Sequence, residues 1–257
     1  MAVTYEEALV RAPHAVSLRN VSKSFGDGPR VLDGIDLEVK PGEFLCLVGA
    51  SGCGKSTLLS LVAGLEEPTA GRVHHHGNGA ALMFQESALF PWLTAGQNVE
   101  LALRLRGVPR GARRPEAERL LSLVRLEGQA KKRVHELSGG MRQRVALARA
   151  LAQDSSVLLM DEPFAALDAI TRDALHEELT RVWAEVGLTV LFVTHNVREA
   201  VRLGQRVVLL SSKPGRVAAE WEVGIPQPRR IESPEVAGLS VEITERLREE
   251  IRRHGRD

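Results

Sequence analysis

The chain has 257 residues, of which 44% are hydrophobic and 26% charged, and its formal net charge is +1. This composition is ordinary for a soluble globular protein, and the near-zero charge argues neither for nucleic acid nor for acidic partners. The two cysteines, Cys46 and Cys53, are too few for a disulfide framework, so we expect reduced thiols. Residues 1–14 lack the apolar core of a secretory signal, and no apolar run approaches the roughly 20 residues that span a bilayer.

Two segments near the start of the chain, residues 17–25 and 31–39, are predicted to be β-strands. The second alternates apolar and polar residues, as in an antiparallel sheet with one exposed face. From Phe44 onward the strand-like runs are almost wholly apolar, which is typical of strands buried on both faces of a parallel sheet. These runs are residues 44–48, 80–84, 156–160, 189–194 and 206–210. Helical spacing at 171–187 lies between two of them, so the sequence predicts an α/β core.

The segment between residues 86 and 155 has helical spacing and no strand-like run, and we interpret it as an inserted α-helical subdomain. Its middle part is rich in arginine. A nucleic-acid patch is one interpretation, but no aromatic residues interleave for base stacking, so a solvated helical face is favoured. An amphipathic helix is expected at 241–257, within a tail too short for a second domain.

Three consecutive histidines, His74, His75 and His76, invite a metal interpretation. Consecutive residues of a strand point to alternating faces, so the three cannot all bind one ion. We expect a strand at the surface edge of a sheet.

A glycine-rich turn follows the run at 44–48 and fits the pattern G-x-x-x-x-G-K-[ST] of a phosphate-binding loop. Its glycines let several N–H groups point inward, and the following helix adds its own free N–H groups. We expect Lys55 to reach the β- and γ-phosphates, Ser56 to ligate Mg²⁺, and Thr57 to bond the α-phosphate. An ordinary strand-to-helix turn is the alternative. The predicted ATP-binding residues of this turn are Gly49, Ser51, Gly52, Cys53, Gly54, Lys55, Ser56 and Thr57.

Polar residues follow three of the other buried runs. Asp161 and Glu162 follow one, Gln85 another and His195 a third. Ligands of an open α/β sheet bind outside the carboxyl ends of its strands, so we expect these residues at one rim with Gly49. Asp161 is then placed to hold Mg²⁺, and Glu162 to polarise a water aimed at the γ-phosphate. Gln85 is expected to contact water and Mg²⁺, and His195 the γ-phosphate. Structural polar residues are the alternative.

The most specific stretch is HELSGGMRQRVALARAL, in which Ser138, Gly139 and Gly140 open a helix and form a second anion-binding N-terminus. With all these motifs in order, residues 15–225 resemble the ATP-binding cassette (ABC) ATPases, and Ser138, Gly139 and Gly140 match that family's signature motif. The resemblance implies an ATPase that uses ATP and Mg²⁺ and pairs head to tail. The three signature residues would then act in trans, on the γ-phosphate held by the partner.

The resemblance assigns two further positions. Asp168 matches the D-loop residue that lines the dimer contact, and Phe25 takes the place of the aromatic residue that stacks on adenine. A core strand residue is the alternative for Phe25. The chain departs from the usual pattern at Met141, Ala165 and Asn196. None of these removes a catalytic group, and the presence of Glu162 leads us to expect hydrolysis.

The implied fold class is α/β: a P-loop NTPase (RecA-like) parallel sheet with an N-terminal antiparallel β-subdomain and an inserted α-helical subdomain. We expect one ABC ATPase domain over residues 1–257. Its core would cover about 15–85 and 156–225, its helical subdomain about 86–155, and a short tail 226–257.

The segment MFQESALFPWLTAGQNVELALRLRGV is similar to the nitrate, sulfonate and taurine import group. The short gap between Gly71 and Gln85 is similar to that of its aliphatic-sulfonate subunits. This implies the ATP-hydrolysing subunit of a bacterial importer for a small anion, at the cytoplasmic face of the membrane. The implied partners are a second copy, transmembrane permease subunits and, through them, a solute-binding protein, with no nucleic acid. Phe90, Pro91 and Trp92 are expected to contact the permease, with a buried loop anchor as the alternative.

Two other functions stay open. The first is a soluble ATP-driven clamp or regulator, which the arginine-rich helical stretch supports. The second is a small-molecule kinase, which the signature motif disfavours.

Overall fold

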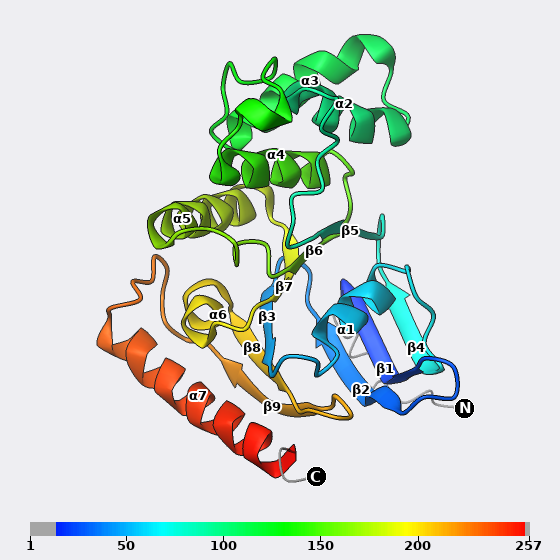
Figure 1. Ribbon diagram of the computed structural model, residues 1–257, viewed down its shortest axis with the longest axis vertical. Helices are drawn as coiled ribbons and strands as arrows, with labels where there is room; N and C mark the ends of the chain where they lie inside the picture. Colours follow the sequence, from blue (N-terminus) through cyan, green and yellow to red (C-terminus); the bar gives the residue numbers. More distant parts are fainter. Residues whose placement is uncertain (1–13, 255–257) are drawn as a thin grey trace, which may run out of the picture.

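The computed structural model describes residues 14–254, so the segment in which no secretory signal is expected lies almost wholly outside the described residues. The described chain contains a three-stranded and a six-stranded β-sheet together with helices (Figure 1). The strands are β1 (Val16–Ser24), β2 (Arg30–Val39), β3 (Phe44–Gly49), β4 (Ala70–His75), β5 (Ala80–Met83), β6 (Val157–Asp161), β7 (Thr189–Val193), β8 (Arg206–Leu210) and β9 (Val217–Glu222). The helices are α1 (Lys55–Val62), α2 (Ala95–Leu105), α3 (Arg110–Leu123), the 3₁₀ helix η1 (Val134–Glu136), α4 (Gly139–Leu151), α5 (Ala169–Val186), α6 (Val197–Leu203) and α7 (Pro234–His254).

The smaller sheet is antiparallel and has the order β2-β1-β4. Strand β4, which carries His74 and His75, pairs only with β1 and so lies at the edge of this sheet, as predicted for these histidines.

The larger sheet has the strand order β5-β6-β7-β3-β8-β9. Its first five strands are parallel, and β9 pairs antiparallel with β8 at one edge. Because parallel strands end at the same edge of a sheet, the residues that follow β3, β5, β6 and β7 lie along one rim. The predicted fold class is confirmed: a parallel P-loop sheet, an N-terminal antiparallel sheet and an inserted set of helices.

The larger sheet is buried on both faces, because alternate side chains of its strands enter two different cores. Leu45 and Leu47 of β3 pack into a core shared with α1 and the antiparallel sheet. Phe44, Cys46 and Val48 of the same strand pack on the opposite side with residues of α4, α5, α6 and α7. This double burial explains why β3 is wholly apolar in sequence.

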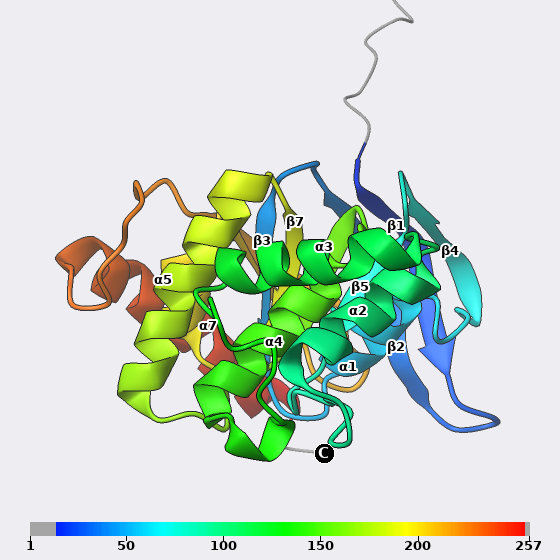
Figure 2. The ribbon, with the colours of Figure 1, turned by 90° about the horizontal axis from the view of Figure 1, so that it is seen from above.

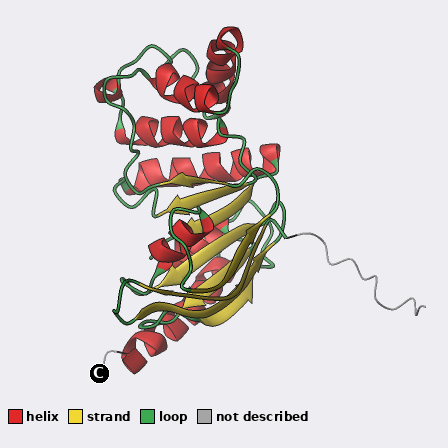
Figure 3. Cartoon of the chain, turned by 90° about the vertical axis from the view of Figure 1, so that its right-hand side faces the viewer, coloured by secondary structure: helices red, strands yellow, loops and turns green. Residues whose placement is uncertain are grey.

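Helices α2, α3 and α4 pack together between β5 and β6 in the chain and form a layer beyond the edge of the larger sheet (Figures 1 and 3). Viewed from above this layer, α2, α3 and α4 lie in front of the strands, with α5 beside them (Figure 2). No helix within residues 14–254 combines the length and the apolar character needed to cross a membrane.

Two predicted helix starts are wrong, and one strand was missed. The helix expected at 171–187 begins at Ala169, because Asp168 caps its first turn, and it ends at Gly187 as predicted, in the left-handed conformation. The tail helix begins at Pro234 rather than at residue 241, and residues 255–257 lie outside the described part. Strand β9 was not expected, because its side chains are only partly buried and lack a strand pattern.

Candidate nucleotide-binding site

The phosphate-binding loop runs from the end of β3 to the start of α1. Gly52 and Gly54 have φ values of 76° and 98°, which favour glycine over other residues. A Cβ on Gly49 would lie 2.7 Å from Cys53 Sγ and 2.9 Å from the Leu210 carbonyl oxygen. Glycine is therefore required by the curl of the loop at two positions and by close packing at a third.

Lys55 is the first residue of α1 and is buried. Its Nζ donates hydrogen bonds to the carbonyl oxygens of Gly49 and Ala50, both at 2.9 Å, so the ammonium group is folded back onto the loop. The amide of Leu58 donates to the Gly54 carbonyl, the first bond of the helix, which leaves the preceding amides of α1 without an intrahelical acceptor. A cation and free amides at one helix N-terminus form an anion-binding site.

Asp161, the last residue of β6, hydrogen-bonds the exposed Ser56 side chain across the start of α1. Burial raises the pKa of Asp161, the hydrogen bond from Ser56 lowers it, and the nearby Glu162 raises it again. A carboxylate and a hydroxyl in contact are oxygen donors of the kind that Mg²⁺ prefers, so these residues fit that ion. Within residues 14–254 no group of three His, Cys, Asp or Glu side chains could hold a metal. Mg²⁺ would therefore need further oxygen ligands from water and from phosphate.

Glu162 and His195 are in direct contact at the ends of neighbouring strands. His195 Nδ1 lies 2.7 Å from Glu162 Oε2, and the His195 side chain is 65% exposed. The Glu162 amide donates to the Val193 carbonyl, which ties the end of β6 to the end of β7. Glu162 has a φ of 45°, a left-handed backbone that costs energy for a residue with a Cβ and that clusters at functional sites.

Gln85 follows β5 at the same rim, and its side chain is exposed. Its backbone carbonyl accepts a hydrogen bond from Gln143 Nε2 at 3.0 Å, and Gln143 is a buried residue of α4. The predicted residues Gly49, Gln85, Asp161 and His195 thus lie at one rim, but the side chain of Gln85 is not shown in contact with the others.

The signature residues lie at the N-terminus of α4, in the helical layer. Ser138 is exposed, and its Oγ accepts a hydrogen bond from the Met141 amide at 3.2 Å, so it caps the helix. A Cβ on Gly140 would lie 2.6 Å from Thr171 Cγ2, on α5. Gly140 therefore has a packing reason to be glycine, whatever its role toward a nucleotide.

Asp168 is exposed at the start of α5, and its carboxylate accepts a hydrogen bond from the Thr171 amide at 2.9 Å. Hydrogen bonds from Thr171 lower the pKa of Asp168. In its own chain, Asp168 is thus the N-cap of α5, and a role at a dimer contact needs a second copy.

Phe25 follows β1 and is 51% exposed, so the alternative of a core strand residue is wrong. Lys23 Nζ lies 4.8 Å from the centre of its ring. An exposed ring beside a cation is free to stack on a base.

The sequence did not reveal two features of the site. Gly215, in the β8–β9 turn, lies against the phosphate-binding loop, since a Cβ there would be 2.2 Å from the Cys53 carbonyl oxygen. His176 and Glu199 form a buried polar pair that is linked through Glu199 to Thr194, the residue before His195. The available signal was a histidine and a glutamate at positions of amphipathic helices that face the core.

The fold and the loop define a P-loop ATPase: a parallel sheet, a phosphate-binding loop between β3 and α1, and acidic residues at the end of β6. A family model described as ABC transporter matches residues 32–165. The chain belongs to the ABC transporter family, as an ATP-binding cassette.

Relatives and a solved structure agree with this assignment. An aliphatic sulfonates import ATP-binding protein of Agrobacterium fabrum is 46% identical over 235 residues, covering 91% of this chain and 83% of the relative. A taurine import ATP-binding protein of Burkholderia pseudomallei is 49% identical over 195 residues, covering 73% and 75%. The ATP-binding cassette MJ0796, solved as a dimer in a post-hydrolysis state bound to ADP and Pi, is 34% identical with a TM-score of 0.70, covering 82% of this chain and 100% of that one.

Proposed function

We propose that the chain is the ATP-hydrolysing subunit of an importer for a small anion, such as an aliphatic sulfonate, nitrate or taurine. The observation that carries the ATPase chemistry is the 2.7 Å contact between Glu162 and His195, at the rim that also holds the phosphate-binding loop. The names of the import relatives support transport of a small anion.

ATP binds with its phosphates against the loop from Gly49 to Thr57 and its adenine against Phe25. The Lys55 ammonium group exchanges its two carbonyl acceptors for phosphate oxygens, which are stronger partners because they are charged. Ser56 and Asp161 would hold Mg²⁺, with Gln85 beside them, and the ion would supply positive charge against the phosphates.

The Glu162–His195 pair catalyses hydrolysis. The Glu162 carboxylate accepts a proton from the attacking water, and His195 contacts the γ-phosphate. The contact between them fixes which way the carboxylate faces, because one of its oxygens is engaged by His195 Nδ1.

A complete site needs two copies of the chain. Ser138, Gly139 and Gly140 of one copy close on the γ-phosphate held by the other, and Asp168 lines the contact. The exposed Ser138 at a helix N-terminus and the dimer of the related cassette support this arrangement.

The membrane subunits dock on the groove between the larger sheet and the helical layer. This groove has a volume of about 730 Å³, and exposed apolar side chains of Phe84, Phe90 and Leu105 line it. Trp92 is 67% exposed and its ring lies 5.4 Å from that of Phe90, so the alternative of a buried loop anchor is wrong. Exposed aromatic residues around an apolar groove are typical of a protein interface.

The ATPase is tested with Glu162→Gln. We expect this variant to bind ATP, to release phosphate at least a hundred times more slowly than the parent, and to accumulate as an ATP-bound dimer. Glu177→Gln is the matched control, since Glu177 is an exposed glutamate of α5 that lies outside the rim. Phosphate release by Glu162→Gln at the parental rate would overturn the role given to Glu162.

Transport is tested by purification from membranes. Recovery of the chain with an integral membrane protein, weakened by Trp92→Ser and unaffected by Val241→Ser on α7, supports the docking groove. Recovery with nucleic acid or ribosomes and without a membrane protein would favour the soluble clamp or regulator instead.

A further inference from the structure

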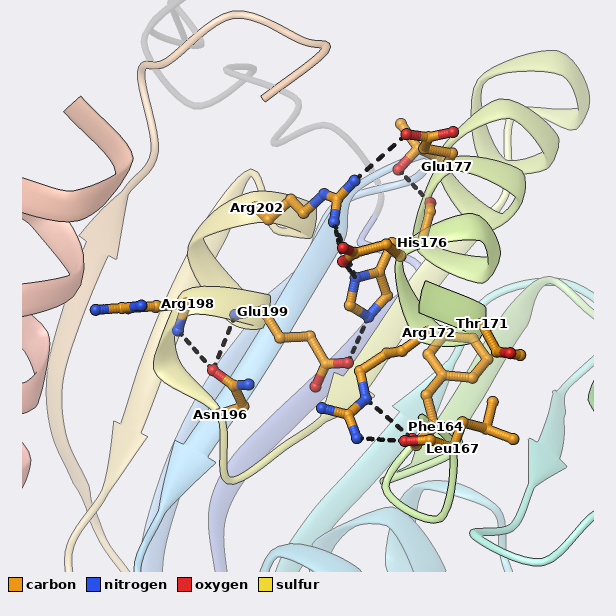
Figure 4. Close-up of polar contacts among 12 residues, drawn as sticks. Phe164, Leu167, Thr171, Arg172, His176, Glu177, Asn196, Arg198, Glu199 and Arg202 are labelled. Atoms are coloured by element: carbon orange, nitrogen blue, oxygen red, sulfur yellow. Dashed lines mark hydrogen bonds and ion pairs between the residues drawn. The ribbon is translucent and has the colours of Figure 1, made fainter. Parts of the chain in front are cut away.

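A chain of buried polar side chains connects α5 to α6 (Figure 4), and one of them, Glu199, also bonds Thr194, the residue before His195. His176 of α5 and Glu199 of α6 are 1% and 6% exposed. His176 Nε2 lies 2.6 Å from Glu199 Oε1, and the other carboxylate oxygen of Glu199 accepts a hydrogen bond from the Thr194 hydroxyl. Both oxygens of a buried carboxylate are therefore engaged, which is what burial of such a group requires.

The two ring nitrogens of His176 face different groups. Nε2 lies against the Glu199 carboxylate, which accepts hydrogen bonds, so Nε2 is the donor of this contact. Nδ1 faces Arg202 Nη1 at 3.5 Å and Asp173 Oδ1 at 3.9 Å. Arg202 is held in turn by Asp173 at 2.6 Å, which fixes the guanidinium beside the ring.

Glu199 also closes a ring of hydrogen bonds around the loop that carries His195. The Thr194 hydroxyl, which donates to Glu199, accepts from the Asn196 amide at 3.0 Å. The Asn196 side chain accepts from the amides of Arg198 and Glu199 at 3.0 and 3.3 Å. His195 lies at the apex of this ring, between Thr194 and Asn196. Its own side chain is exposed, so its direction depends on the backbone that carries it and on the contact with Glu162 rather than on packing.

His176 also contacts the loop that follows Glu162. The ring centres of His176 and Phe164 are 5.6 Å apart, and Phe164 lies two residues beyond Glu162. Arg172, one turn before His176, donates to the carbonyl oxygens of Phe164 and Leu167 (Figure 4). His176 thus bridges the two loops that present Glu162 and His195.

We propose that His176 and Glu199 are positioning residues that hold His195 in contact with Glu162. The proposal rests on the proposed function for its catalytic consequence, but the geometry it predicts at His195 is independent of activity. Glu199 acts on the Thr194–Asn196 backbone and His176 orients Glu199, so neither residue touches the nucleotide.

The first test uses Glu199→Gln. The Gln side chain has the same shape as Glu, but its N–H₂ group cannot accept a hydrogen bond. One of the two bonds, from His176 Nε2 or from the Thr194 hydroxyl, is therefore lost. We expect kcat to fall about tenfold, the equivalent of one such bond, with the KM for ATP unchanged. Glu245→Gln, at an exposed glutamate of α7 outside this network, is the control and should leave kcat unchanged. A fall in kcat that is equal in the control, or a rise in KM alone, would overturn the proposal.

A double-variant cycle separates positioning from general destabilisation. If Glu199 acts through His195, adding Glu199→Gln to His195→Ala should reduce kcat by less than twofold further, because the contact to be held is already gone. A further tenfold fall in that background would contradict the proposal.

The second test does not need ATPase activity or a tolerated change at Glu199. Thr194→Val removes the hydroxyl and Thr194→Ser restores it. We expect the imidazole ¹⁵N resonances of His195, measured at one fixed pH, to shift in Thr194→Val and Glu199→Gln and to return to the parental position in Thr194→Ser. If the His195 resonances of the folded Thr194→Val variant are unchanged, the proposal is contradicted even if the parent hydrolyses ATP. A parent that hydrolyses no ATP but shows these shifts would refute the proposed function and keep the positioning role.

Discussion

Gly140→Ala separates the two reasons why the signature motif has glycine at this position. The added Cβ would lie 2.6 Å from Thr171 Cγ2, while the next neighbour, Leu175 Cδ1, is at an ordinary 4.0 Å. Overpacking at one atom costs about 1–3 kcal/mol of unfolding free energy. The second substitution Thr171→Ser deletes the clashing methyl group and keeps the hydroxyl and the backbone amide that Asp168 caps, so the double variant should regain most of that loss.

The ATPase rate should respond differently. If Gly140 approaches the partner's phosphate as we propose, a side chain there hinders that approach, and the loss of one charge-assisted hydrogen bond lowers the rate about tenfold or more. The assay is urea unfolding and phosphate release for Gly140→Ala, Thr171→Ser and the double variant. We expect the double variant to be stable and still slow. A double variant that regains both stability and the parental rate would show that Gly140 is only a packing residue.

Three further predictions each concern a single residue. Phe25→Ala should raise the KM for ATP roughly five- to a hundredfold with kcat unchanged, because a stacking surface is lost. Trp92→Ala, which removes another exposed aromatic side chain, should leave KM unaltered, and an effect of equal size in both would contradict the stacking role. Burial raises the pKa of Asp161, so its ionised form is disfavoured in the folded protein and costs stability at neutral pH, a cost that disappears as the pH falls through that raised pKa. Asp161→Asn should therefore raise the Tm of the ligand-free protein at pH 7.5. It should also abolish the additional rise in Tm that Mg²⁺ produces when ATP is present, as EDTA should in the parent; a Mg²⁺ effect that persists in the variant would exclude Asp161 as a ligand. Arg229 is buried and donates to four backbone carbonyls, so Arg229→Met should lower the free energy of unfolding by about 3 kcal/mol. Arg230→Met, at an exposed position, should lower it by almost nothing, and equal losses in the two variants would contradict this role of Arg229.

The rim of the sheet could be predicted from sequence because its logic is local. Each of Gln85, Asp161 and His195 follows an apolar run, and parallel strands bring their ends to one edge whatever the strand order. The phosphate-binding loop could be predicted equally well, since its glycines, its lysine and the flanking strand and helix are contiguous in the sequence.

Features that depend on contacts between distant segments could not be predicted. His176 and Glu199 belong to different helices, and nothing in either helix alone indicates that they meet. Strand β9 pairs with β8 at the sheet edge although its side chains are mostly half-exposed, so tertiary contact rather than pattern determines it. The start of α7 was a missed local signal: Ser233 and Pro234 are a favourable N-cap and first residue of a helix.

Ser138 and Asp168, which we propose act across a dimer, also have structural roles within one chain. The structure gives Ser138 and Asp168 roles as helix caps within one chain, and each cap alone explains the residue. Only the behaviour of two copies together can separate the cap from a contact to the partner's nucleotide.

Mixing two inactive variants tests the shared site most directly. Lys55→Ala disables the phosphate-binding loop, and Ser138→Glu places a negative charge at the exposed helix end that faces the partner's phosphate in the proposed dimer. A head-to-tail dimer of one copy of each contains one site with both parts intact. We expect the equimolar mixture to release phosphate at roughly a quarter of the parental rate, because half the dimers are mixed and each has one working site of two. A mixture no faster than the sum of the two separate variants would contradict catalysis shared between copies.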